Sequence, residues 1–151
     1  MEKILLITGG SSEIGIDLLK RIEGDYKRIY VQYRRMNDDL FQLVKERKGK
    51  GDLLPVCADF SDFNQVKQMI KDIESRGDIP NQIVHFPSPK AYNKQFHKDN
   101  WNNVEKGWEI CVHSITEILR KFIPSMVRQH YGRIVFMLTS CTVNYPAKYQ
   151  S

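Results

Sequence analysis

The sequence predicts an α/β fold in which a single domain is built on a doubly wound parallel sheet. Three observations lead to this prediction. Five short apolar segments alternate along the chain with four longer amphipathic segments, which is the order of βαβ units. A glycine-containing turn separates the first apolar segment from the first amphipathic one. The length of 151 residues suits one domain.

The strand candidates are short, apolar and bounded by Gly, Asp, Asn or Pro. They span residues 4–7, 28–33, 53–57, 82–86 and 132–138. Helices are predicted between them, at residues 14–23, 38–48, 63–76 and 101–130. Because consecutive βα units join through right-handed crossovers, we expect the strand order 3-2-1-4-5.

The last helical stretch is the longest element that we expect. Pro124 lies inside it and predicts a kink. Its apolar residues predict a broad buried face that packs against the sheet. These residues are Ile110, Val112, Ile115, Ile118, Leu119, Phe122, Ile123 and Met126.

Residues 8–15, Thr-Gly-Gly-Ser-Ser-Glu-Ile-Gly, connect the first strand to the first helix. Gly9 and Gly10 permit backbone angles that a Cβ would penalise, and Gly15 permits close packing of helix and strand. Amides at the start of a helix bind anions, and serine hydroxyls there cap the helix or donate to a phosphate. The pattern predicts a dinucleotide site with contacts from Gly9, Ser11, Ser12, Glu13, Ile14 and Gly15. The alternative is an ordinary strand-to-helix turn with a serine cap.

Arg34 and Arg35 follow the second strand, where a sheet of this type meets the adenosine ribose. An acidic residue there would accept a hydrogen bond from the free 2′-hydroxyl of NAD, whereas a guanidinium pairs with a 2′-phosphate. The two arginines therefore favour NADP(H) as the cofactor. The alternative is that they begin a solvated turn.

Asp59 follows the third strand, in the segment Ala58-Asp59-Phe60-Ser61-Asp62. Its carboxylate is placed to accept a hydrogen bond from the adenine amino group. Asp62 or Ser61 is expected to cap the next helix. Capping alone would also explain an acidic residue in this loop.

Composition argues against several other classes of protein. Hydrophobic residues make up 41% and charged residues 27% of the chain, which is typical of a globular protein. No apolar run approaches the ~20 residues that span a bilayer, and no secretory signal precedes the first strand, so we expect a cytoplasmic protein without a membrane partner. The net charge of +5 comes from dispersed basic residues interleaved with acidic ones, which argues against a nucleic-acid partner.

The cysteines Cys57, Cys111 and Cys141 are too widely spaced to indicate a disulfide framework or a metal site. We expect them to be buried or idle thiols.

With these residues in hand, the chain resembles the short-chain dehydrogenase/reductase family over essentially its whole length. The resemblance rests on residues 8–15, on 58–62, on Gly132-Arg133-Ile134-Val135 and on Pro124-Ser125-Met126. Within the family it looks most like the 3-oxoacyl-acyl-carrier-protein reductases. The resemblance implies a Rossmann-type fold, an NADPH cofactor and a small-molecule carbonyl substrate that accepts the hydride. A chain that lacks the last strands of this fold should expose an apolar edge, so we also expect a homo-oligomer.

The chain departs from the family pattern at three places. Glu13 stands where the family has a small residue, and its carboxylate would repel a pyrophosphate if it turned inward. His85-Phe86-Pro87-Ser88 replaces Asn-Asn-Ala-Gly, so the floor under the cofactor ribose must be built differently, and Phe86 and Pro87 are expected among the cofactor contacts. His85 is either a ligand contact or a packed strand-end histidine. Cys111 stands at the position of the family's helix-four asparagine.

The resemblance places the catalytic hydroxyl on Thr139, with Ser140 beside it, where it would stabilise charge on a carbonyl oxygen. The Tyr-x-x-x-Lys pair of the family does not occur in the sequence. We therefore expect this chain to carry the cofactor-binding part of a reductase and to lack the last strands. Two alternatives stay open, which are a non-catalytic dinucleotide-binding or regulatory module and an interaction domain that docks through the edge of its fifth strand.

Overall fold

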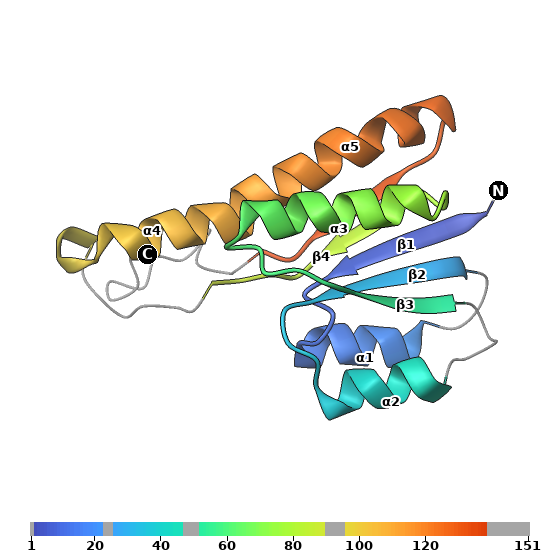
Figure 1. Cartoon of the computed structure of the whole chain (residues 1–151), viewed down its shortest axis with the longest axis horizontal. Helices are drawn as coiled ribbons and strands as arrows, with labels where there is room; N and C mark the ends of the chain where they lie inside the picture. Colours follow the sequence, from blue (N-terminus) through green and yellow to red (C-terminus); the bar gives the residue numbers. More distant parts are fainter. Residues whose placement is uncertain (1, 23–25, 47–51, 90–95, 139–151) are drawn as a thin grey trace.

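The computed structural model describes residues 2–22, 26–46, 52–89 and 96–138, and it shows one parallel sheet flanked by helices (Figure 1). The strand order is β3-β2-β1-β4-β5, which confirms the predicted topology. The strands are β1 (Lys3–Thr8), β2 (Tyr26–Tyr33), β3 (Asp52–Cys57), β4 (Gln82–His85) and β5 (Arg133–Phe136).

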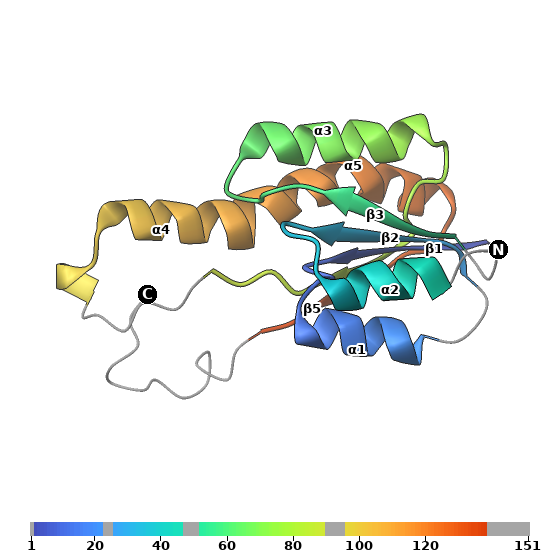
Figure 2. The ribbon, with the colours of Figure 1, turned by 60° about the horizontal axis from the view of Figure 1, so that its bottom comes forward.

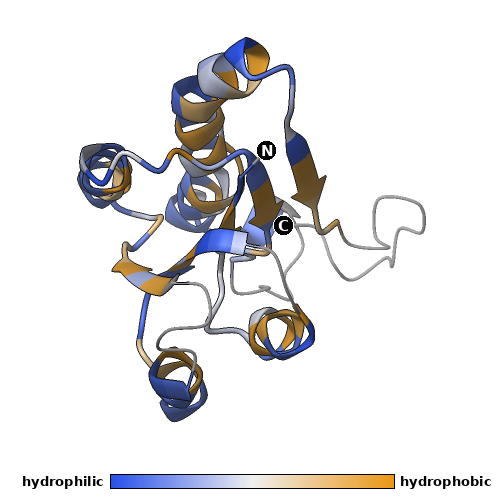
Figure 3. Ribbon diagram, turned by 90° about the vertical axis from the view of Figure 1, so that its right-hand side faces the viewer, coloured by the Kyte–Doolittle hydropathy of each residue, from blue (hydrophilic) through white to orange (hydrophobic). Residues whose placement is uncertain are grey.

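Helices cover both faces of the sheet (Figures 1 and 2). On one face lie α1 (Glu13–Arg21) and α2 (Asp38–Glu46), and on the other lie α3 (Phe63–Ser75) and α5 (Ser114–Arg128). A short 3-10 turn (Phe96–Lys98), α4 (Trp101–Trp108) and a π-helical segment (Glu109–His113) precede α5. Figure 3 shows that the helices carry hydrophobic residues along one side, as helices packed on a sheet must.

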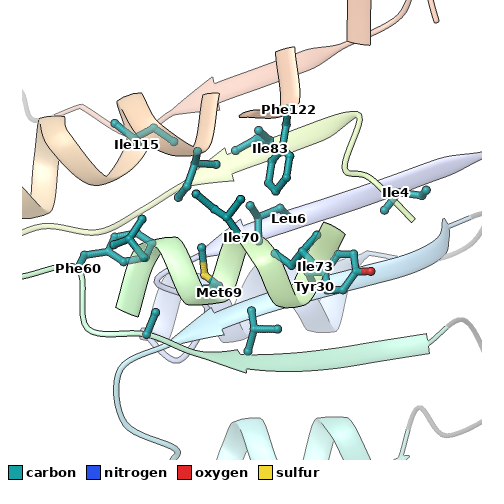
Figure 4. Packing of buried hydrophobic residues seen from close by; sticks show 14 of the residues in the cluster. Ile4, Leu6, Tyr30, Phe60, Met69, Ile70, Ile73, Ile83, Ile115 and Phe122 are labelled. Carbon is teal, nitrogen blue, oxygen red and sulfur yellow. The ribbon is translucent and has the colours of Figure 1, made fainter. Parts of the chain in front are cut away.

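The core consists of two apolar clusters, one on each face of the sheet. Along β1, Leu6 belongs to the cluster under α3 and α5, whereas Leu5 and Ile7 belong to the cluster over α1 and α2. This division follows from the alternation of side chains along a strand. Figure 4 shows the first cluster, where Phe122 of α5 and Ile70 of α3 approach the sheet.

Pro55 lies inside β3 without disturbing the sheet. β3 pairs with β2 and is the terminal strand of the described sheet. A proline has no amide hydrogen to donate, and such a position tolerates this because one side of the strand has no ladder to complete.

The single helix predicted at residues 101–130 is divided by a π-helical turn at Glu109–His113, whereas α5 continues through Pro124. The Ser114 hydroxyl donates to the Ile110 carbonyl at 2.7 Å, which occupies the acceptor that an α-helix would offer to the Ser114 amide. That amide instead donates to the Glu109 carbonyl, one residue further back. Both groups of Ser114 thus bond to carbonyls of the π-helical turn.

The predicted buried face of the long helix is also too broad. Ile115, Ile118 and Phe122 are buried, but Val112 and Ile123 are exposed, and no residue of α4 is buried. Figure 2 shows that α4 extends past the end of the sheet and has no strand to pack against, which explains the exposure of α4 only.

Several element ends differ from the predictions. β4 ends at His85 instead of Phe86, because Pro87 follows and offers no amide to the ladder. β5 covers only Arg133–Phe136, and its four residues are all exposed. Of the two expected alternatives, buried or idle thiols, burial is wrong for Cys57 and Cys111, which are free and exposed, whereas Cys141 lies outside the described residues.

Among the described helices, none combines the length and apolar character that crossing a bilayer would require.

Candidate functional site

A groove of about 720 Å³ opens at the carboxyl ends of the strands. It lies beside β1, between the β2 and β4 sides of the sheet, which is the switch point where doubly wound sheets bind ligands. Eight of the eleven residues predicted to contact a cofactor line it, namely Gly9, Ser11, Ser12, Ile14, Arg34, Asp59, Phe86 and Pro87.

The β1–α1 turn forms one wall of this groove. Gly9 has a φ of 70°, a conformation that favours glycine, and a Cβ on it would lie 3.2 Å from the Pro87 nitrogen. Ser12 is the N-cap of α1, and its Oγ accepts a hydrogen bond from the Gly15 amide at 3.1 Å. A Cβ on Gly15 would lie 2.7 Å from Gly10 Cα, so Gly15 lets the helix sit directly on the turn.

The start of α1 offers unused hydrogen-bond donors. Internal bonds occupy the amides of Gly9, Gly10 and Gly15. In the described part of the chain, no partner is found for the amides of Ser11, Glu13 and Ile14. Free amides at the positive end of a helix dipole attract an anion, and Ser11 and Ile14 line the groove. The predicted phosphate-binding turn therefore has the donors that this role needs.

Glu13, Gly15 and Arg35 do not line the groove. The exposed Glu13 lines a separate cavity of about 190 Å³, together with Asp17 and Lys20 of α1. This smaller cavity shares Ser11 with the groove. Gly15 is buried under the turn and contributes through packing.

Arg34 and Asp59 bring opposite charges to the β2–β3 end of the groove. Partial burial alone would raise the pKa of Asp59. The amide and the hydroxyl of Ser61 both donate to Asp59 Oδ1, at 2.9 and 2.8 Å. These bonds, with the positive charges of Arg34 and Arg35, outweigh the effect of burial and hold the pKa of Asp59 below its usual value. Asp62, not Ser61, caps α3, by accepting the Asn64 amide.

His85 is a packed strand-end residue, 4% exposed, next to the groove-lining Phe86. Its Nδ1 lies 2.8 Å from the Thr8 hydroxyl, and its ring stacks on Phe60 at 6.3 Å between centroids. Burial lowers the pKa of His85 from 6.5 to about 4, so the ring is neutral at physiological pH.

Sequence reasoning missed Gln32, which lines the groove and is 3% exposed. Its side chain links the β1–α1 turn to the end of β3. The available signal was a polar residue inside the apolar strand segment Ile29-Tyr30-Val31-Gln32-Tyr33, because a buried amide in a strand requires partners.

The opposite end of the groove is lined by Ile110 and Met137. Cys111, the counterpart of the family's asparagine, does not line the groove, and His113 stacks on Phe63 at 4.0 Å between ring centroids. Thr139 and Ser140, the predicted catalytic hydroxyls, lie outside the described residues. No cluster of three or more potential metal ligands occurs among the residues that are described.

The sequence matches a family model described as short chain dehydrogenase over residues 3–150. Among curated proteins it is similar to a fatty acyl-CoA reductase of Acinetobacter baylyi, with 20% identity over 88% of this chain and 45% of that protein. It is also similar to the uncharacterized oxidoreductase YvrD of Bacillus subtilis, with 26% identity over 89% of this chain and 50% of that protein. The chain thus spans about half the length of these curated relatives.

Solved structures show the same fold. L-sorbose reductase of Gluconobacter frateurii, complexed with NADPH and L-sorbose, superposes with a TM-score of 0.83 at 20% identity, over 98% of this chain and 56% of that one. The NADH-dependent reductase A1-R′, responsible for alginate metabolism, superposes with a TM-score of 0.77 at 15% identity, over 96% of this chain and 61% of that one. The two relatives use different nicotinamide cofactors, so the fold alone does not select one.

Proposed function

Because the chain belongs to the short chain dehydrogenase family, we propose that its groove binds NADP(H) for an oxidoreductase that reduces a small carbonyl compound of the 3-oxoacyl type. The observation that carries this proposal is the pairing of two features in one groove. The free amides of the β1–α1 turn lie at one side, and Arg34 follows β2, where no acidic residue is present to accept the ribose hydroxyl of NAD.

The described residues suggest how an NADP(H) molecule would be held. The amides of Ser11, Glu13 and Ile14 would donate to the pyrophosphate, and Arg34 would pair with the 2′-phosphate. Arg35 does not line the groove, but its charge acts on Asp59 and adds to the local positive potential.

The remaining contacts concern the adenine and the ribose. Asp59 is proposed to accept from the adenine amino group through Oδ2, because Ser61 already occupies Oδ1. Phe86 and Pro87 are proposed as the apolar floor beneath the nicotinamide ribose, since both line the groove beside Gly9. When bound, the cofactor supplies the hydride.

For the reduction step we propose that Thr139, with Ser140 beside it, donates a hydrogen bond to the substrate carbonyl oxygen. Negative charge develops on that oxygen as the hydride arrives, and a positioned hydroxyl stabilises it. The support for these two residues is their position in the sequence, counted from Gly132.

Calorimetric titration with NADPH and NADH tests the cofactor proposal. We expect tighter binding of NADPH, and we expect Arg34→Ala to weaken NADPH binding by roughly 10- to 100-fold while leaving NADH almost unaffected. Arg35→Ala should have a smaller effect. Arg21→Ala is the matched control, because it removes an exposed guanidinium that pairs with Asp17 on α1, outside the groove.

Equal affinity of the unaltered protein for the two dinucleotides would contradict the assignment of NADP(H). Absence of binding to either would contradict the dinucleotide site as a whole.

The catalytic proposal is tested by following NADPH oxidation in the presence of 3-oxoacyl thioesters and simple ketones, with the protein expressed from its complete reading frame. Thr139→Ala is expected to lower turnover while NADPH affinity is retained, and Ser140→Ala serves as its neighbour control. Tight NADPH binding without turnover of any carbonyl would instead favour the non-catalytic binding module.

We also propose a cytoplasmic homo-oligomer. Val135 and Phe136 of β5 and Val127 of α5 are exposed apolar residues, and a second copy would cover them. Light scattering should give a mass that is a multiple of the chain mass, whereas a monomer at micromolar concentration would contradict the oligomer. Cell fractionation tests the location.

A further inference from the structure

Gln32 of β2 makes three hydrogen bonds at the ends of three neighbouring strands. Its Oε1 accepts from the Gly9 amide at 2.7 Å, and its Nε2 donates to the Ala58 carbonyl, also at 2.7 Å. Its backbone carbonyl accepts from the Gly10 amide at 2.8 Å. The orientation of the side-chain amide follows from its partners, because Gly9 offers a donor and Ala58 an acceptor.

These contacts lie between two parts of the proposed cofactor site. Gly9 begins the turn that carries the free amides of Ser11, Glu13 and Ile14, and Ala58 directly precedes Asp59. The only side chain that the structure shows bonded to both Gly9 and Ala58, within the described residues, is that of Gln32. It therefore sets the spacing between the phosphate-binding turn and the adenine-side loop.

The same contact also determines which amides remain for a ligand. The Gly9 amide donates to Gln32 and is unavailable to a phosphate, and the Gly10 amide is likewise occupied. Removal of the side-chain amide would leave the partly buried Gly9 amide and the buried Ala58 carbonyl without these partners. The turn would then relax toward other partners, since an unsatisfied buried polar group is costly.

We propose that Gln32 is a positioning residue for dinucleotide binding, which acts by holding the β1–α1 turn and the Asp59 loop at the separation that a pyrophosphate-linked adenosine requires. This inference rests on the proposed function, because it presupposes a dinucleotide in the groove. It adds a specific consequence. Ligands that span both parts should depend on Gln32, and ligands that contact only the adenine-side loop should not.

The test compares Gln32→Met with the unaltered protein, because methionine keeps the length of the side chain and removes both polar atoms. Calorimetry is performed with NADPH and ADP-ribose, which contain the pyrophosphate, and with 2′-AMP, which does not. We expect Gln32→Met to weaken NADPH and ADP-ribose binding roughly tenfold, and to change 2′-AMP binding much less.

Asn81→Leu is the matched control. Asn81 is a buried amide at the opposite end of the sheet, where its Oδ1 accepts from the Ile4 amide and its Nδ2 donates to the Glu2 carbonyl. Its replacement should lower thermal stability without changing dinucleotide affinity. This control separates general destabilisation from positioning.

Gln32→Glu provides a second readout, which holds even if Gln32→Met does not fold. A protonated carboxyl group can accept from Gly9 and donate to Ala58 as glutamine does, whereas a carboxylate cannot donate. The ADP-ribose affinity of Gln32→Glu, relative to the unaltered protein at the same pH, should therefore rise as the pH is lowered.

Three results would overturn the role of Gln32 alone, two of them with Gln32→Met. These are unchanged NADPH affinity in Gln32→Met and an equal loss of affinity for 2′-AMP and ADP-ribose. A pH-independent affinity ratio for Gln32→Glu would do the same. Failure of the unaltered protein to bind any dinucleotide would instead refute the proposed function, and the positioning role with it.

Discussion

Acidification is expected to destabilise the folded chain through His85. The ring is buried, with Nδ1 next to the Thr8 hydroxyl and with Phe60 and Phe136 packed around it. Within the described residues, Nε2 is buried and has no hydrogen-bond partner. A charged imidazolium would lose its hydration here without gaining a carboxylate, and this desolvation lowers the pKa from 6.5 to about 4.

The sign and size of the effect follow from this difference in pKa. Between pH 6.5 and 4 the unfolded chain binds a proton at His85 and the folded chain does not, so stability falls as the pH falls through that window. A shift from 6.5 to about 4 corresponds to a total loss of about 3 kcal/mol, of which about 2 kcal/mol is lost between pH 7 and pH 5.

Urea denaturation at pH 7 and pH 5 measures this loss. His85→Asn should remove about 2 kcal/mol of the pH dependence, because asparagine retains a polar atom near Thr8 but does not titrate. His97→Asn, at an exposed histidine, is the control and should keep the full dependence. The reasoning is refuted if the stability of the unaltered protein and of His85→Asn falls by the same amount between the two pH values.

Three further substitutions test the packing around the groove. Gly15→Ala should destabilise the protein by about 1–3 kcal/mol, because the added Cβ would meet Gly10 Cα at 2.7 Å. The control Gly107→Ala, in α4, should be neutral or slightly stabilising. Equal denaturation midpoints for the two variants would contradict this prediction. Tyr30→Phe should raise stability by about 1 kcal/mol, because the buried hydroxyl has no partner among the described residues, and a measured loss would reveal one. Ser12→Ala should cost about 1 kcal/mol and weaken NADPH binding, and an unchanged thermal midpoint would argue against its role as the cap.

The sequence predicts the parts of this protein that depend on local chemistry. Alternation of apolar runs and amphipathic segments indicates a doubly wound parallel sheet, and capping rules locate the starts of α1 and α3. The position of Ser12 is an example, because the cap hydrogen bond joins residues only three apart, Ser12 and Gly15. Arg34 is likewise located by its place directly after β2.

The missed features depend on partners that are distant along the chain or on competition between donors. Gln32 bonds to Gly9 and Ala58, which are 23 and 26 residues away, and no local pattern encodes such a pairing. The π-helical turn at Glu109–His113 was also missed, because its apolar residues continue the periodicity of an α-helix and do not reveal the change of hydrogen-bonding pattern. The finding that Glu13 lines the smaller cavity and not the groove also required the structure, since the sequence only places this residue at the helix start.

The charge balance at the ends of β2 and β3 links these observations to cofactor choice. Asp59 is the acidic residue that lines the groove among the residues described, and its lowered pKa means that it is ionised at neutral pH. A carboxylate there would repel a 2′-phosphate if it stood alone. The positive charges of Arg34 and Arg35 both interact with the Asp59 carboxylate, so two positive charges face one negative charge and the region keeps a surplus positive charge. The amide and hydroxyl of Ser61 donate hydrogen bonds to Oδ1 of this carboxylate. Because a dianionic phosphate gains more from that surplus than a neutral ribose hydroxyl does, the balance of charge is the physical basis for the proposed preference for NADP(H) over NAD(H).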